Sequence, residues 1–529
     1  MPPRQTSTPI DPTNLSLEQM AGQLLMAGFP GTAPGEEARA LIQECYLGAV
    51  CLFLQNCTGG PSQVRALTAA LQDLAATAHL PGPLVAIDQE GGLVTRLRHP
   101  FAVFPSQMAQ AATGNPRTAY RVARAMAREM RAVGIHWDFA PVLDVNNNAS
   151  NPVIGGRSFG SGPAQVAEFG VAALTGYRDG GVVACGKHFP GHGDTHVDSH
   201  LDLPTVNFGW ERLEAVELIP FRAAIAAGIP TLMTAHIRFP AVDDLPATLS
   251  AKMLEGVLRQ RLGFGGLIIT DALNMKAIAD AYGPGEATVR AIQAGADMAL
   301  TLFGVEDVRA AYRALVAAVR DGTIPERRFQ AAVERVLSLK RGIAALPPAR
   351  GLSFPVATHQ ILAQQVAANS VTVTRDQGVL PIRPASAGRV GLIDFSLVRY
   401  SQVEEARKPG LHFQQALTAR LPQLRGLMVD SNPSAQEVAD VRALAESCDT
   451  LILVVRNAGL VPAQADLVRW LVALGKPTVV YAARLPYDLM VCPQARCLLT
   501  TYGDPPCSLD AAAAVILGDA KARGGNLVS

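Results

Sequence analysis

Short apolar runs recur along the N-terminal part of the chain, and a longer segment with helical periodicity follows each of them. About eight such runs lie between Leu24 and Leu302, namely QLLMAGF, GAVCLFL, PLVAID, IHWDFAPVLD, VVACGKHF, TLMTAHI, LIITDA and MALTLF. They are nearly continuously apolar rather than alternating, which is typical of parallel strands covered on both faces. Segments between them, such as PSQVRALTAALQDLAATAHL, PAQVAEFGVAALTGYRDG and WERLEAVELIPFRAAIAAG, have helical spacing.

Strict alternation of strands and helices predicts an α/β fold, a (β/α)₈ TIM barrel that ends in two more helices around 310–320 and 329–340. A doubly wound open sheet is the alternative. In a barrel, polar residues at the strand ends converge at the C-terminal mouth, where barrel enzymes carry their active sites. Five residues occupy such positions: Asp88, Lys187, His188, His236 and Asp271.

A second pattern begins after the Pro- and Gly-rich stretch ALPPARGLSFP. There RVGLIDFS, TLILVVRNAG, PTVVYAAR and RCLLTTYG are interpreted as buried strands with helical segments between them. We predict a catalytic barrel over 1–345, a linker over 346–356 and a smaller α/β layered (sandwich) domain over 357–529. Arg484 and Asp504 lie near strand ends of that domain, where we expect turn and surface residues without a catalytic role.

Composition narrows the class of protein. The 46 Lys and Arg residues balance 45 Asp and Glu, without a basic cluster that would bind nucleic acid. No apolar run approaches the ~20 residues that span a bilayer, and the polar N-terminus lacks the order of a signal peptide, so we expect a cytoplasmic protein without membrane insertion. Export by another route stays open. The 8 cysteines form no CxxC pair, which favours buried free thiols over disulfides or zinc.

The densest polar cluster is KHFPGHGDTHVDSH, residues 187–200, directly after a predicted strand. Loops on a rigid barrel are where function concentrates, so we interpret this cluster as functional. Its histidines are spaced four apart, which on a helix would favour a metal site. The proline and two glycines within the cluster argue against a continuous helix, so a metal site is the weaker alternative.

Three further segments end in or follow predicted strands. In LIITDALNM the apolar strand ends at Asp271. This residue either caps the next helix or faces the same mouth as the histidine loop. DQEGG, followed by Arg96, and GGRSFG, which contains Arg157, are each weak signals alone. Together with the cluster at 187–200, these segments supply polar groups for a sugar-sized pocket: Asp88, Arg96, Arg157, Lys187 and His188.

The combination of DQEGG with Arg96, GGRSFG, KHFPGHGDTHVDSH and ITDALNM resembles glycoside hydrolase family 3, in its β-N-acetylglucosaminidase branch. The resemblance covers nearly the whole chain, since QMAGQLLMAGFPG is similar to the family's opening and GVLPI, LLTTYGDPP and GGNL to its second domain. It implies that Asp271 is the nucleophile and that Asp198 and His200 form the acid/base dyad. It also implies that Asp88, Arg96, Arg157, Lys187 and His188 hold the hydroxyls of the terminal sugar.

We therefore expect a retaining, exo-acting β-N-acetylglucosaminidase without metal or other cofactor, acting on peptidoglycan fragments or chitooligosaccharides. Within the family, an N-acetylglucosaminide phosphorylase, a β-glucosidase and a β-xylosidase are the alternatives. From other classes, a metal-dependent amidohydrolase on the same barrel and a carbohydrate-binding protein without catalysis stay open. The sequence does not predict the oligomeric state.

Overall fold

The computed structural model describes residues 15–199, 201–302, 304–349, 351–396, 401 and 411–527. Its N-terminal part is built on eight strands in the order β11-β8-β7-β6-β3-β2-β1-β12. A bridge between Ile269 and Met298 joins the two outer strands, so the sheet is a nearly closed parallel barrel. The predicted barrel is thus confirmed over the open sheet. Its strands are β1 (Leu25–Ala27), β2 (Ala49–Leu52), β3 (Leu84–Ile87), β6 (Trp137–Asp138), β7 (Val183–Phe189), β8 (Thr231–Thr234), β11 (Leu267–Ile269) and β12 (Ala299–Thr301).

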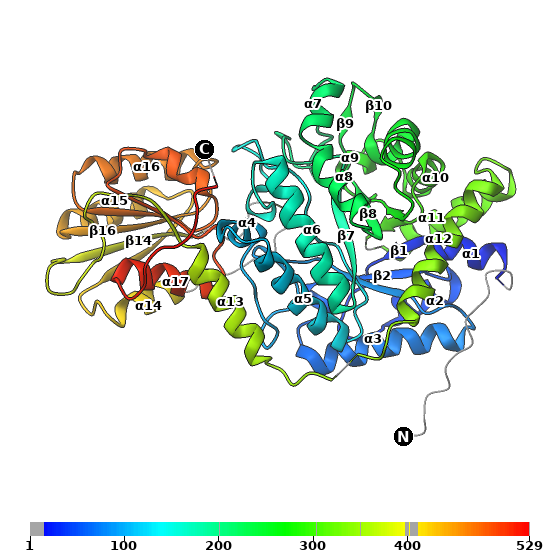
Figure 1. The fold of residues 1–529 in the computed structure, drawn as a ribbon, viewed down its shortest axis with the longest axis horizontal. Coiled ribbons are helices and arrows are strands. Elements are labelled where there is room, and N and C mark those ends of the chain that lie inside the picture. Colours follow the sequence, from blue (N-terminus) through cyan, green and yellow to red (C-terminus); the bar gives the residue numbers. More distant parts are fainter. Residues whose placement is uncertain are drawn as a thin grey trace.

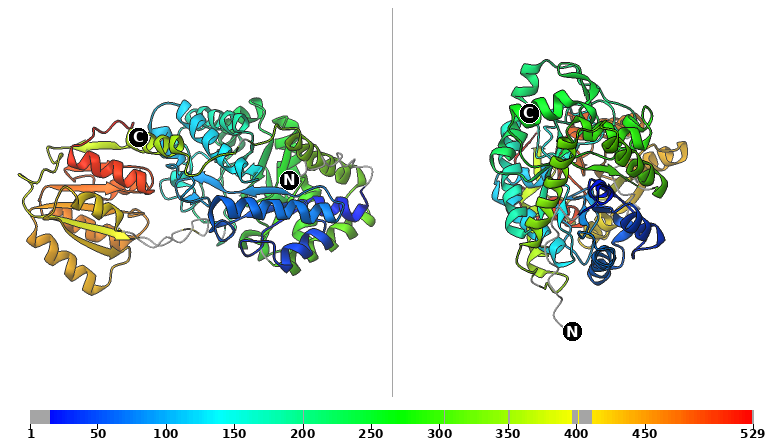
Figure 2. Two further views of the ribbon diagram at one scale, coloured as in Figure 1. Left: turned by 90° about the horizontal axis from the view of Figure 1, so that it is seen from below. Right: turned by 90° about the vertical axis from the view of Figure 1, so that its right-hand side faces the viewer.

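Helices cover the outside of this barrel (Figures 1 and 2). Two of them, α5 and α6, pack closely because α6 has glycines where α5 approaches. A Cβ at Gly176 would lie 2.3 Å from the carbonyl oxygen of Tyr120. The main helices of this part are α1 (Leu17–Gln23), α2 (Glu36–Glu44), α3 (Gly60–Thr77), α4 (Gln107–Ala112), α5 (Arg117–Ala132), α6 (Pro163–Gly180), α7 (Trp210–Ala215), α8 (Leu218–Ala226), α9 (Lys276–Ala279), α10 (Pro284–Ala294), α11 (Val305–Arg320) and α12 (Glu326–Ala344).

Two details differ from the predicted pattern. The segment 210–228, expected as one helix, is divided into α7 and α8 because Val216, with φ −128° and ψ −72°, leaves the helical conformation. The segment before β11 is a π-helix, η5 (Lys252–Arg261). Short antiparallel pairs also lie outside the barrel, formed by β4 (Gln89–Gly91) with β5 (Val94–Thr95) and by β9 (Arg238–Phe239) with β10 (Asp243–Pro246).

The C-terminal part is a six-stranded sheet in the order β13-β18-β17-β16-β14-β15, with only β13 antiparallel to its neighbour. Apolar side chains of α13, α14 and α17 pack on one face and those of α15 and α16 on the other, which gives the predicted layered sandwich. The elements are α13 (Ala357–Ser370), β13 (Thr372–Asp376), β14 (Val390–Ser396), α14 (His412–Thr418), β15 (Arg425–Asp430), α15 (Ala435–Ser447), β16 (Thr450–Val455), α16 (Pro462–Ala473), β17 (Thr478–Ala482), β18 (Cys497–Thr500) and α17 (Pro506–Leu517).

The two outer strands of this sheet, β13 and β15, are not among the strands predicted from sequence. Both are edge strands, and most of their residues are exposed or only partly buried. An edge strand has a neighbouring strand on one side only. More of it is therefore exposed, and it does not need a continuous apolar run. The helix α13 leads into β13 and contacts α4 and α5 of the barrel.

The C-terminal ends of the second sheet face the barrel. The Ser106 hydroxyl donates to the carbonyl of Tyr502, which follows β18, over 2.5 Å. The Tyr487 hydroxyl accepts from Nδ2 of Asn146 at 2.9 Å and donates to the Asn146 carbonyl at 3.1 Å. The segments that follow β17 and β18 therefore lie against the barrel.

Arg484 and Asp504 correct our expectation of turn and surface residues. Arg484 is 3% exposed, and its Nε lies 3.4 Å from Oδ2 of Asp504. Arg456 donates to the same carboxylate at 3.0 Å and also contacts Asp394. Because these strand ends face the barrel, residues that would lie on a free surface are instead buried and paired.

Two expectations concern the whole chain. The eight cysteines are all free, and seven are buried, in agreement with the prediction. Among the residues that the structure describes, no helix combines the length and the apolar character needed to cross a bilayer.

Candidate active site

The C-terminal end of β7 carries the first charged group of the barrel mouth. Lys187 is 1% exposed, and its Nζ lies 2.6 Å from Oδ1 of Asp88 and 2.6 Å from Oε1 of Glu90. Burial acts to lower the pKa of Lys187, but the two carboxylates outweigh it and raise that pKa above its ordinary value. The amine therefore stays charged although it is buried.

Glu90 lies between two cations. Its carboxylate accepts from Nε and Nη2 of Arg157 at 2.8 and 2.7 Å, in addition to the contact with Lys187. Burial acts to raise the pKa of Glu90, but Arg157 and Lys187 hold it well below its ordinary value. This bidentate pair fixes the plane of the Arg157 guanidinium at the mouth.

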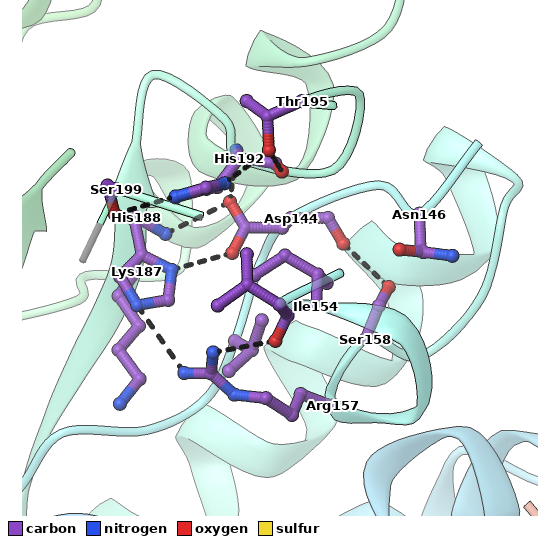
Figure 3. A network of polar contacts seen from close by, with 12 residues as sticks. Asp144, Asn146, Ile154, Arg157, Ser158, Lys187, His188, His192, Thr195 and Ser199 are labelled. Carbon is purple, nitrogen blue, oxygen red and sulfur yellow. Dashed lines mark hydrogen bonds and ion pairs between the residues drawn. The ribbon is translucent and has the colours of Figure 1, made fainter. Parts of the chain in front are cut away.

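Asp144 orients the next residue of β7, His188. The carboxylate accepts from the backbone N–H of His188 at 3.1 Å, and its Oδ2 lies 2.7 Å from Nδ1 of the ring. Since an ionised carboxylate only accepts, Nδ1 is the donor, and Nε2 points to Nη2 of Arg157 at 3.5 Å (Figure 3). Burial acts to raise the pKa of Asp144, yet His188 and His192 lower it. Asp144 is therefore an anion that holds the His188 ring toward Arg157.

The loop after β7 runs back over the segment after β6. A Cβ at Gly193 would lie 1.8 Å from the carbonyl oxygen of Val145, so only glycine allows this close approach. Asn151 donates from Nδ2 to the carbonyl of His192 at 2.8 Å, and Asn148 contacts Nδ1 of His196 at 3.2 Å. Residues 190–199 contain no helix. The four-residue spacing of the histidines therefore does not place them on one helical face.

The segment after β11 brings Asp271 to the same mouth. Oδ1 of Asp271 accepts from the backbone N–H of Ala272 at 2.8 Å. The backbone N–H of Ala277, in the first turns after Asp271, donates to the carbonyl of Ser199 at 3.3 Å. This hydrogen bond joins the loop that carries Asp198 to the segment that carries Asp271.

The remaining predicted residues are found as follows. Arg96 is 4% exposed, and its guanidinium lies 5.9 Å from the centre of the Phe53 ring. Asp198 is 4% exposed and accepts through its carbonyl from Leu201 at 2.8 Å. His200 lies outside the described residues. Of the predicted set, the structure joins Asp88, Lys187, Arg157 and His188 through Glu90 and direct contacts.

His236, at the end of β8, supports the backbone next to Asp271. Its Nε2 lies 2.9 Å from the carbonyl oxygen of Ala272, and its Nδ1 lies 2.8 Å from Oγ1 of Thr248. In the part of the chain that the structure describes, no three His, Cys, Asp or Glu side chains gather as they would around a metal ion.

Comparison with known families agrees with this geometry. The family described as "Glycosyl hydrolase family 3 N terminal domain" matches residues 16–339, which is more than half of the chain and covers every barrel strand. The chain belongs to glycosyl hydrolase family 3. The predicted family is therefore confirmed, and the protein is a glycoside hydrolase.

Several relatives within glycosyl hydrolase family 3 are similar over long stretches. A β-hexosaminidase A of Pseudoalteromonas piscicida is 34% identical over 416 residues, which cover 70% of this chain and 69% of that protein. A β-hexosaminidase of Alkalilimnicola ehrlichii is 41% identical over 298 residues, 55% of this chain and 84% of that protein. The solved structure of a family 3 β-N-acetylglucosaminidase from Paenibacillus sp. FPU-7 has a TM-score of 0.91 at 39% identity, and the match covers 97% of this chain and 98% of that one.

Sequence reasoning missed the groups that organise this family 3 site. Glu90, Asp144 and His192 were read only as parts of longer motifs, although each is buried at the mouth. Glu90 follows Asp88 by two positions, and Asp144 ends the predicted strand IHWDFAPVLD. That position was a signal for Asp144, because polar residues at strand ends face the mouth. For His192 the sequence held no signal that separates it from the other histidines of the loop.

Proposed function

We propose that the protein is a retaining, exo-acting β-N-acetylglucosaminidase with Asp271 as nucleophile and the Asp198/His200 pair as acid/base. The observation that carries this proposal is the hydrogen bond from Ala277 to Ser199, 3.3 Å long, because it joins the dyad loop to the segment after Asp271. Relatives named β-hexosaminidase and β-N-acetylglucosaminidase support the choice of sugar.

In the first half-reaction, the carboxylate of Asp271 attacks the anomeric carbon and forms a covalent glycosyl-enzyme. His200 donates a proton to the leaving oxygen, and Asp198 fixes the tautomer of the ring and stabilises its charged form. In the second, His200 takes a proton from the water that displaces Asp271. Attack from opposite sides in the two steps gives retention of configuration.

The charged residues of the mouth hold the terminal sugar. Lys187 has three N–H donors, of which Asp88 and Glu90 take two, and we assign the third to a sugar hydroxyl. Asp88, with an 18% exposed side chain, is an acceptor that a hydroxyl can reach. Arg96, Arg157 and His188 complete the set of groups that recognise the sugar. The fixed plane of Arg157 favours one orientation of the ring.

The test compares 4-nitrophenyl N-acetyl-β-glucosaminide with the corresponding glucoside. We expect preferential release from the N-acetylglucosaminide, a product of retained configuration, and no turnover by Asp271→Ala. His200→Ala is expected to slow natural glycosides far more than activated aryl glycosides, which need no protonation. Preference for the glucoside, inverted product or an active Asp271→Ala variant would each contradict the proposal.

Two further measurements refine the reaction. Product analysis with and without added phosphate is expected to give free N-acetylglucosamine in both cases, whereas sugar 1-phosphate would establish a phosphorylase. Muropeptides and chitooligosaccharides offered in competition identify the natural aglycone, and we expect faster cleavage of peptidoglycan fragments. Treatment with a chelator is expected to leave turnover unchanged, which distinguishes this mechanism from a metal-dependent amidohydrolase.

A further inference from the structure

His192 lies in the middle of the loop between β7 and Asp198 and is 2% exposed. Its backbone N–H donates to Oδ1 of Asp144 at 2.7 Å. Its ring reaches two other residues of the same loop, with Nδ1 2.8 Å from Oγ1 of Thr195 and Nε2 3.1 Å from Oγ of Ser199 (Figure 3). Both ring nitrogens are therefore used within the loop.

The chemistry of the ring argues against a direct role with substrate. Burial, followed by the nearby His188, lowers the pKa of His192 to about 4, so the His192 ring stays neutral near neutral pH. The Thr195 hydroxyl donates to the His192 carbonyl at 3.2 Å, which assigns the ring hydrogen to Nδ1. Nε2 then accepts the Ser199 hydroxyl. In this arrangement both ring nitrogens are committed to the loop.

Ser199 connects two parts of the candidate site. It stands between Asp198 and His200 in the sequence and is 2% exposed. Its hydroxyl contacts the ring of His192, whose backbone N–H donates to Asp144. Its carbonyl accepts from the backbone N–H of Ala277 at 3.3 Å. The residue next to the dyad is thus held from the side of β7 and from the side of Asp271.

We propose that His192 is a positioning residue that, through Ser199, holds Asp198 and the adjoining part of the loop against the segment that follows Asp271, and so supports the acid/base step. This inference rests on the proposed function, since it concerns the acid/base of that reaction. A general acid must come within about 2.6–3.2 Å of the leaving oxygen, and a displacement of about 1 Å costs up to 100-fold in rate. The hydrogen bond between His192 and Ser199 ties two positions of this glycine-containing loop together.

The sharpest variant is Ser199→Ala, which removes one hydroxyl and leaves the ring in place. We expect kcat on glycosides with poor leaving groups to fall by about 10- to 100-fold, and kcat on an activated aryl N-acetylglucosaminide to change by less than about threefold. His192→Asn, whose amide reaches Thr195 but not Ser199, is expected to show the same pattern. His192→Gln, whose longer side chain reaches Ser199, is expected to recover part of the loss.

Two controls separate positioning from a general structural effect. The double variant His192→Asn with Ser199→Ala is expected to lose no more than either single variant, because both remove one interaction. His359→Gln alters another buried histidine, which lies on α13 and whose Nδ1 is 2.7 Å from Oε1 of Glu129 on α5. We expect this variant to lower the thermal midpoint of unfolding. Any change in its kcat should be the same for poor and for activated leaving groups.

The results distinguish the two proposals. Equal losses of kcat on both kinds of leaving group, or no loss in Ser199→Ala, would overturn the positioning role. The proposed function would still stand if the wild type is active and Asp271→Ala is inactive. If the wild-type protein does not cleave the aryl N-acetylglucosaminide, the proposed function fails and the positioning role fails with it.

Discussion

Nδ1 of His188 lies 2.7 Å from Oδ2 of Asp144, and the same carboxylate also accepts from the backbone of His188 and of His192. One fully buried anion thus sets both the ring that we assign to sugar binding and the start of the loop that leads to the dyad. Charge-assisted hydrogen bonds of this kind are shorter and stronger than neutral ones.

Replacing this anion tests its role. In Asp144→Asn, an amide group faces three donors and can accept with only one atom, so at least one buried donor loses its acceptor. Loss of a hydrogen bond to a charged group is worth about 1.5–3 kcal/mol, which corresponds to about a 10- to 100-fold loss in kcat/KM. Steady-state kinetics on the aryl N-acetylglucosaminide measures it. Unchanged kcat/KM would show that His188 needs no support from Asp144.

Glu90→Gln tests the charge balance of the mouth. Removing the carboxylate leaves Lys187 and Arg157 with like charges close together in a buried site, and we expect a loss of about 3–5 kcal/mol in unfolding free energy and a raised KM. Chemical denaturation and kinetics provide the two readouts. The control is Glu286→Gln, which breaks an exposed pair with Arg290 and is expected to cost less than about 1 kcal/mol. Similar losses in both variants would contradict the role of Glu90.

Tyr487→Phe tests the contact between the two parts of the chain. The change removes a hydroxyl that accepts from Nδ2 of Asn146 and donates to its carbonyl. These two buried atoms of Asn146 then each lose a hydrogen bond. We expect a cost of about 1–3 kcal/mol, seen as a lower midpoint for separation and unfolding of the second domain in differential scanning calorimetry. Tyr120→Phe, which loses one exposed hydrogen bond to Asp179, serves as the control and is expected to change little. Equal shifts would mean that the contact adds nothing specific.

Asp488→Asn tests a pH dependence in the second domain. Burial raises the pKa of Asp488 from 3.8 to about 7, although the N–H of Gly459 donates to it at 3.0 Å. Between these two pH values the unfolded chain releases the proton and the folded one keeps it, so the wild type loses up to about 1.4 kcal/mol of stability per pH unit as pH rises. The Asn variant does not titrate.

The expected result is a stability of Asp488→Asn, relative to wild type, that increases from pH 4 to pH 7 and is constant above it. Thermal midpoints at several pH values measure this difference. Asp466→Asn, at a side chain that is 76% exposed, is the matched control and should show no such trend. A parallel course of wild type and Asp488→Asn would refute the raised pKa.

The sequence by itself determined the barrel and the family. Most strands of the barrel lie in nearly continuous apolar runs, and the segments between them have helical periodicity, so both can be predicted from neighbouring residues. The motifs that hold Asp88, Arg157, Lys187 and Asp271 are likewise short and local. The assignments of Asp198 and His200 as a dyad stay predictions.

Only the tertiary structure decided which charged groups meet. Glu90 reaches Arg157 across 67 positions of the chain, Asp144 reaches His188 across 44, and Tyr487 reaches Asn146 across 341. The exposed edge strands β13 and β15 and the burial of Asp504 likewise depend on what packs beside them. Local patterns fix which segment is a strand or a helix, but the partner and the charge state of a buried side chain follow from the order of strands around the barrel and from the faces that the two domains cover.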